Sequence, residues 1–132
     1  MLDHLIIDGY NILYAWHGDK VSSRGAMDQA RVDLIRQLES VAAQRDIHCT
    51  VVFDGSAIED LLHTSSKLLE VCFAGPKSSA DHVIERMVCE RQERCGIVVV
   101  TNDHLEGQLV TGWGAHVWSS GMFLTWLESD VM

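Results

Sequence analysis

Short runs of apolar residues alternate along the chain with longer segments in which apolar positions recur every three or four residues. The short runs predict buried β-strands, because each is shorter than a typical helix and three of them end at an Asp-Gly or Gly-Pro turn signal. We expect five strands, at residues 5–7, 49–53, 68–74, 96–100 and 115–118.

The segments between these runs have the spacing of amphipathic helices. Residues 80–88 carry the clearest apolar stripe, and a longer helix is expected from about residue 26 to residue 45. Strands that are apolar throughout and alternate with such helices indicate a parallel sheet with helices on both faces. We therefore predict an α/β fold, formed by a single domain over residues 1–132, in which residues 18–25 are the most loop-like stretch.

Composition limits the kinds of protein this chain can be. Its 132 residues are 47% hydrophobic and 22% charged, as in compact globular domains. Nineteen acidic residues against ten basic ones give a net charge of −9, which argues against non-specific electrostatic binding to nucleic acid or to an anionic membrane. The sequence has no C-x-x-C pair, no basic stretch ahead of an apolar N-terminal run and no apolar run of roughly 20 residues, so we predict a cytoplasmic location and no membrane partner.

Acidic residues follow the predicted strands at the points where the strands end. Asp8, Asp54 and Asp103 come after three of the apolar runs, and Asp81 opens the helix after a fourth. In a parallel sheet these strand ends meet at one edge, and ligands bind there at the reversal of strand order. We therefore expect four carboxylates to be directed to one edge of the sheet.

Each of these acids also has a purely structural interpretation. Ser78-x-x-Asp81 and Asp103-x-x-Glu106 both match a capping box, and an Asp-Gly pair is a common turn. The four acids together favour a divalent cation, because carboxylates a few ångströms apart repel one another unless a cation lies between them. Mg²⁺ prefers such oxygen ligands and assists phosphodiester hydrolysis by water.

Asn11 lies one turn after Asp8, where it either presents its amide to the same water or phosphate or begins a helix. Motifs for several other chemistries are missing from the sequence. There is no G-x-G-x-x-G, no G-x-x-x-x-G-K-[ST] and no H-E-x-x-H, and the position two residues after Asp8 holds Tyr10 instead of a second acid. Dinucleotide binding, P-loop chemistry, structural zinc and an aspartyl-phosphate intermediate are therefore disfavoured.

Five segments carry a recognisable pattern when they are taken in order and at their intervals. They are Ile6-Ile7-Asp8-Gly9-Tyr10-Asn11, Ala30-Arg31, Val51-Val52-Phe53-Asp54-Gly55, Ser79-Ala80-Asp81 with Ile84-Glu85, and Val100-Thr101-Asn102-Asp103. With them the chain resembles the YacP-like NYN-domain ribonucleases of the PIN-like superfamily. The resemblance extends from Leu5 to about Leu124.

The resemblance implies a Rossmann-like sheet of strand order 3-2-1-4-5 and internal cleavage of RNA by water, dependent on Mg²⁺ or Mn²⁺. It implies that Asp8, Asp81 and Asp103 hold the metal and that Asp54 is a further acid of the metal site. Asn11 would orient water or phosphate, and would complete the catalytic group with Asp8, Asp81 and Asp103.

Few basic residues are available to follow an RNA backbone. The resemblance places Arg31 near the catalytic edge, and Lys20, Arg24 and Lys77 are expected to border it. The predicted partner is RNA, single-stranded or messenger, and delivery by a ribosome or another RNA-bound assembly stays open. Two other functions also stay open: a non-catalytic RNA- or ribosome-binding module of the same fold, which the shortage of basic residues favours, and a small-molecule phosphohydrolase that uses the same acids.

Overall fold

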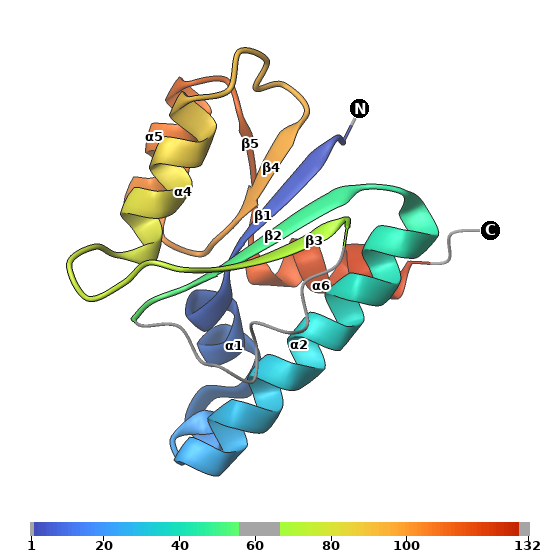
Figure 1. The fold of residues 1–132 in the computed structure, drawn as a ribbon, viewed down its shortest axis with the longest axis vertical. Helices are drawn as coiled ribbons and strands as arrows, with labels where there is room; N and C mark the ends of the chain where they lie inside the picture. The colour runs from blue at the N-terminus through green and yellow to red at the C-terminus, as the bar shows by residue number, and fades with distance from the viewer. Residues whose placement is uncertain (1, 56–66, 130–132) are drawn as a thin grey trace.

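The computed structural model describes residues 2–55 and 67–129, and its centre is a five-stranded sheet (Figure 1). The strands are parallel and follow the order β3-β2-β1-β4-β5. The predicted α/β class and the order 3-2-1-4-5 are therefore confirmed. The strands are β1 (His4–Asp8), β2 (His48–Phe53), β3 (Leu69–Phe73), β4 (Ile97–Val100) and β5 (His116–Trp118).

Helices cover both faces of the sheet. One layer contains α4 and α5, and the other contains α1, α2 and α6 (Figure 1). Among the described residues, none of the helices combines the length and the apolar character needed to cross a bilayer. The helices are α1 (Gly9–His17), the 3-10 helix η1 (Gly18–Val21), α2 (Arg24–Arg45), α4 (Ala80–Cys89), α5 (His104–Gly112) and α6 (Ser120–Glu128).

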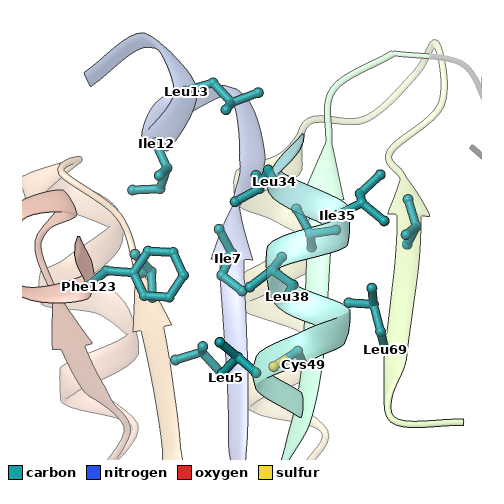
Figure 2. Close-up of a cluster of buried hydrophobic side chains, with 14 of the residues drawn as sticks. Leu5, Ile7, Ile12, Leu13, Leu34, Ile35, Leu38, Cys49, Leu69 and Phe123 are labelled. Carbon is teal, nitrogen blue, oxygen red and sulfur yellow. The ribbon is translucent and has the colours of Figure 1, made fainter. Parts of the chain in front are cut away.

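Alternate residues of the central strand β1 enter two different cores. Leu5 and Ile7 pack in the core that α2 and α6 cover, as Figure 2 shows, whereas Ile6 packs in the core on the α4–α5 side. Side chains of a strand alternate between its faces. His4 and Asp8 therefore share the face of Ile6, so the two ends of β1 bring buried polar side chains to the α4–α5 side of the sheet.

The stretch predicted as most loop-like, residues 18–25, is largely helical. It contains η1, and α2 begins at Arg24 because Ser23 Oγ accepts the backbone N–H of Ala26 at 3.2 Å. The prediction of a loop was therefore wrong for most of this stretch. Its serines suggested a loop, whereas Ser23 serves as a helix cap, and Lys20 and Arg24 lie on helical turns.

Two glycines close the ends of β2 and β3 against each other. Gly55 and Gly75 have φ values of 90° and 84°, a conformation that glycine adopts far more readily than other residues. The N–H of Gly75 donates to the carbonyl of Gly55 at 2.8 Å. This contact holds the end of β2, which carries Asp54, beside the loop that leads to α4.

Candidate active site

Three carboxylates converge at the edge of the sheet where β1 ends. Asp8 is the last residue of β1, Asp81 lies in the first turn of α4, and Glu106 lies in the first turn of α5. One carboxylate oxygen from each side chain lies within 4.8 Å of the others. Asp8 and Glu106 are only 5% and 2% exposed, and Asp81 is half-buried. We refer to these three residues as the acidic cluster.

The backbone next to Asp8 brings α1 close to β2. Gly9 begins α1, and a Cβ at this position would overlap the Phe53 ring. Phe53 also packs against Tyr10, with ring centroids 5.0 Å apart. The Asp8-Gly9 pair therefore has a geometric reason, because the glycine lets a helix start over β2 directly after the strand residue that carries the carboxylate.

Two of the predicted acids lie outside the acidic cluster and hold the starts of its helices. Asp54 Oδ1 accepts the N–H of Ala80 at 2.7 Å, which fixes the first residue of α4 next to Asp81. Asp103 caps α5, since its Oδ1 accepts two backbone N–H groups at 3.0 and 3.3 Å, the second of which belongs to Glu106. Asp103 thus positions the backbone of Glu106, and Asp54 positions the backbone of Ala80 next to Asp81.

Burial and crowding raise the pKa values of two cluster members. Burial, followed by the negative charge of Asp81, raises the pKa of Asp8 to about 7. Burial, followed by the charges of Asp8 and Asp81, raises the pKa of Glu106 to about 9. Among the described residues, neither carboxylate oxygen of Glu106 makes a hydrogen bond of normal geometry, although the Thr101 and Asp81 side chains lie beside this carboxyl group. A buried carboxyl group with no donor is energetically costly, so the cluster needs either bound protons or a cation.

The acidic cluster fits the predicted cofactor, Mg²⁺ or Mn²⁺. These hard cations prefer oxygen ligands, and three carboxylates from three separate elements supply them. A cation there would remove the repulsion among the carboxylates and would bind the buried oxygens of Glu106.

Asn11 belongs to a hydrogen-bonded bridge beside the acidic cluster. Its Oδ1 accepts the N–H of Asn102 at 2.8 Å. Asn102 in turn exchanges two hydrogen bonds with Ser120, whose carbonyl accepts from Trp16 Nε1 at 3.1 Å. The bridge joins α1, the loop after β4 and the start of α6. The amide NH₂ group of Asn11 has no partner among the described residues and stays available as a donor.

The four residues predicted to contact RNA lie on α2, on η1 and in the loop before α4. Arg31 of α2 is only 8% exposed, donates to the Tyr10 hydroxyl at 2.9 Å and pairs with Asp28. No hydrogen bond joins any of the four to the acidic cluster within the described part of the chain. The other three residues, Lys20, Arg24 and Lys77, are exposed.

Glu106 is the cluster member that sequence reasoning missed. Its place three residues after Asp103 matches a capping box, and that pattern gave the glutamate a structural interpretation. A second signal was available, because Glu106 precedes Val110 by four residues and therefore shares the buried face of α5. A charged residue on the buried face of a helix is a stronger pointer to a functional group than its capping position.

Three comparisons with known proteins find chains that are similar to this one. The profile of the family described as YacP-like NYN domain matches residues 5–130. The "Uncharacterized protein YacP" of Bacillus subtilis (strain 168) is 28% identical over 116 residues, which cover 86% of this chain and 68% of that protein.

Crystal structures of Rae1 (YacP) from Bacillus subtilis have a similar fold. A single-residue mutant has a TM-score of 0.77 and 28% identity, with 96% of this chain and 76% of that chain covered. A second structure has a TM-score of 0.78 and 26% identity, with 96% and 74% covered.

Proposed function

Because the chain belongs to the YacP-like NYN domain family, a nuclease- and RNA-related family, we propose that it is a metal-dependent endoribonuclease. The observation that carries the proposal is the acidic cluster. Asp8, Asp81 and Glu106 place carboxylate oxygens within 4.8 Å of one another, and two of these side chains are buried. Such crowding destabilises a protein that binds no cation, whereas a bound cation would offset the repulsion among the carboxylates.

We assign the metal to Asp8, Asp81 and Glu106, and we assign positioning roles to Asp54 and Asp103. This set differs from the one that the resemblance implies, because Glu106 takes the place of Asp103 and Asp54 is not part of it. Bound Mg²⁺ or Mn²⁺ would polarise a phosphoryl oxygen and lower the pKa of an attacking water. The protein contributes a shielded group of carboxylates whose backbones are held by Asp54 and Asp103.

The side chains around the cluster would hold the RNA. The free NH₂ group of Asn11 would donate to a phosphate oxygen or to the attacking water, while its oxygen stays bonded to Asn102. Phosphates on either side of the cleaved bond would meet Arg31 and, farther out, Lys77. Lys20 of η1 and Arg24 at the start of α2 would extend this contact.

The net charge of −9 makes unaided RNA affinity weak. We therefore propose that the substrate is single-stranded or messenger RNA, presented in the cytoplasm by a ribosome or another RNA-bound assembly.

The test is cleavage of end-labelled RNA by the purified protein, with Mn²⁺ or with excess chelator. We expect metal-dependent internal cleavage that leaves 5′-phosphate and 3′-hydroxyl ends, because the attacking group is water. Cleavage that persists in chelator contradicts the proposal, and 2′,3′-cyclic phosphate ends would show attack by the RNA's own hydroxyl. RNA that binds without being cut would favour the non-catalytic module. Hydrolysis of a generic phosphate ester alone would favour the phosphohydrolase.

A further inference from the structure

A second polar pocket lies at the opposite end of β1, on the same face of the sheet as the acidic cluster. It is an open cavity of about 530 Å³, a size that accepts a small ligand. His4 and Asp8 are four residues apart on β1, so roughly 13 Å separates this pocket from the cluster. We refer to it as the basal pocket. Its polar lining is His4, His48, Thr50, Lys67, Glu70 and Arg91.

The hydrogen bonds in the basal pocket have a fixed direction. Arg91 Nη2 lies 2.7 Å from His4 Nδ1, and since a guanidinium can only donate, Nδ1 accepts. The ring hydrogen is therefore on Nε2, which donates to Thr50 Oγ1 at 2.7 Å. The Thr50 hydroxyl then still has its own hydrogen to donate, and no acceptor for it lies among the described residues. Both His4 and Thr50 are buried, so this donor chain is built into the fold.

Basic side chains outnumber acidic ones in the described lining of the basal pocket. Within the described ranges no carboxylate lies within ion-pair distance of Arg91, whose guanidinium makes one hydrogen bond, the one to His4. Burial, followed by the charges of Arg91 and His48, lowers the pKa of His4 to about 4, so the ring is neutral and contributes no counter-charge. Two basic side chains and two imidazoles thus face a single acid, in a chain whose net charge is −9.

We propose that the basal pocket binds the phosphate group of a small molecule, either free phosphate or a nucleoside monophosphate. Arg91 would supply a charged pair of donors, and the Thr50 hydroxyl would supply a donor that has no acceptor among the described residues. An anion is the missing complement to both features. The cavity of about 530 Å³ leaves room for a nucleoside beyond the phosphate. This inference does not depend on the proposed nuclease activity.

The test is an NMR titration of ¹⁵N-labelled full-length protein in excess chelator, which removes any contribution from metal at the acidic cluster. Inorganic phosphate is added in one series and adenosine 5′-monophosphate in a second. We expect saturable shifts of the His4, Thr50 and Arg91 amide signals. Arg91→Gln should weaken binding at least about tenfold, because it removes a charged donor. Arg36→Gln makes the same charge change at an exposed position of α2 and should bind like wild type.

A second pair of variants tests the hydroxyl itself. Thr50→Val removes the donor at nearly constant volume and should weaken phosphate binding, whereas Thr50→Ser keeps the hydroxyl and should bind more tightly than the valine variant. Tighter binding of the nucleotide than of phosphate identifies a nucleotide pocket, and equal binding identifies a pocket for the ion alone; both results support the proposal. Shifts that do not saturate at millimolar ligand, or equal affinities of Arg91→Gln and wild type, overturn it.

Discussion

The two ends of β1 carry buried polar side chains in opposite situations. His4 and Asp8 lie on the same face of the sheet and are 6% and 5% exposed. Both ring nitrogens of His4 have a hydrogen-bond partner, in Arg91 and Thr50. The neighbours of Asp8 are two further carboxylates, Asp81 and Glu106. Burial is similar at the two ends, so the charge of the neighbours separates them: His4 has one neutral and one basic hydrogen-bond partner, whereas Asp8 has like-charged carboxylates beside it that a cation would stabilise.

The largest expected effect is at the Asp8 end of β1, where the acidic cluster lies. Glu106→Gln should reduce metal-dependent RNA cleavage at least about 100-fold, because an amide replaces a metal-binding carboxylate. With a pKa of about 9 the Glu106 carboxyl is protonated at neutral pH without metal, so the free energy of unfolding in chelator should change little. Initial cleavage rates in Mn²⁺ and thermal melts in chelator measure the two effects.

Glu93→Gln, at an exposed position, is the matched control for that substitution. It makes the same chemical change away from the acidic cluster and should cleave like wild type. If Glu106→Gln also cleaves like wild type, Glu106 is not a metal ligand.

The second effect is a pH dependence of stability that only the acidic cluster should show. The raised pKa values of Asp8 and Glu106 mean that the native state keeps protons that the unfolded chain has lost. Their contribution is fully present below the ordinary carboxyl values of 3.8 and 4.5, and it is lost as the pH rises through about 7 and about 9. From about pH 6.5 to about pH 9 the metal-free protein should lose roughly 4 kcal/mol of unfolding free energy.

Urea denaturation in chelator at a series of pH values measures this slope. Glu106→Gln should flatten most of it, and Mn²⁺ should restore stability at the alkaline end because the ion binds the ionised carboxylates. If the unfolding free energy of the wild type does not change with pH, the carboxyl groups at the Asp8 end of β1 do not have raised pKa values.

A smaller effect is expected at the His4 end of β1, where His4 and Thr50 are hydrogen-bonded. Thr50→Val leaves the buried Nε2–H of His4 without an acceptor and should lower the unfolding free energy by about 1–2 kcal/mol. The stability slope between neutral and alkaline pH should stay as in wild type, since the carboxylates are untouched. Urea denaturation of the variant, at the same pH values, checks both statements. A steeper or flatter slope would mean that the two ends are coupled.

The smallest effect concerns Asp103. The resemblance assigns its carboxylate to the metal, whereas in the structure this carboxylate caps the N-terminus of α5. Asparagine caps helices about as well as aspartate, so Asp103→Asn should keep most of the stability and most of the cleavage. Asp103→Ala should lose about 1 kcal/mol. Thermal melts and cleavage rates of both variants decide the matter. If the Asp103→Asn variant is as stable as wild type but does not cleave RNA, Asp103 is a metal ligand.

Much of the scaffold could be predicted because it depends on local patterns. The five apolar runs lie within two residues of the observed strands, and the longer helix was expected close to its observed start and end. The strand order came from the resemblance to NYN domains, since pairing between distant strands leaves no local signal. The Asp8-Gly9 pair could also be predicted from a local pattern, because an apolar run that ends in Asp-Gly indicates the end of a strand.

The rest of both polar sites depends on tertiary contacts. Glu106 was hidden by a local interpretation as a cap partner, and only the packing of α5 shows that its side chain is buried beside Asp8. The basal pocket joins His4 to Thr50 and Arg91, which are 46 and 87 residues away in sequence. No periodicity or spacing could have indicated that these three side chains meet.

The bridge from Asn11 through Asn102 to Ser120 has a consequence for the order in which the site is completed during synthesis. The first residue of the bridge leaves the ribosomal tunnel early, whereas Ser120 lies at the start of α6 and emerges after every strand of the sheet. A nascent chain that has not yet released α6 has all three carboxylates of the acidic cluster, but it lacks the anchor that holds the loop after β4. The release of α6 thus sets when the edge of the sheet acquires its final geometry.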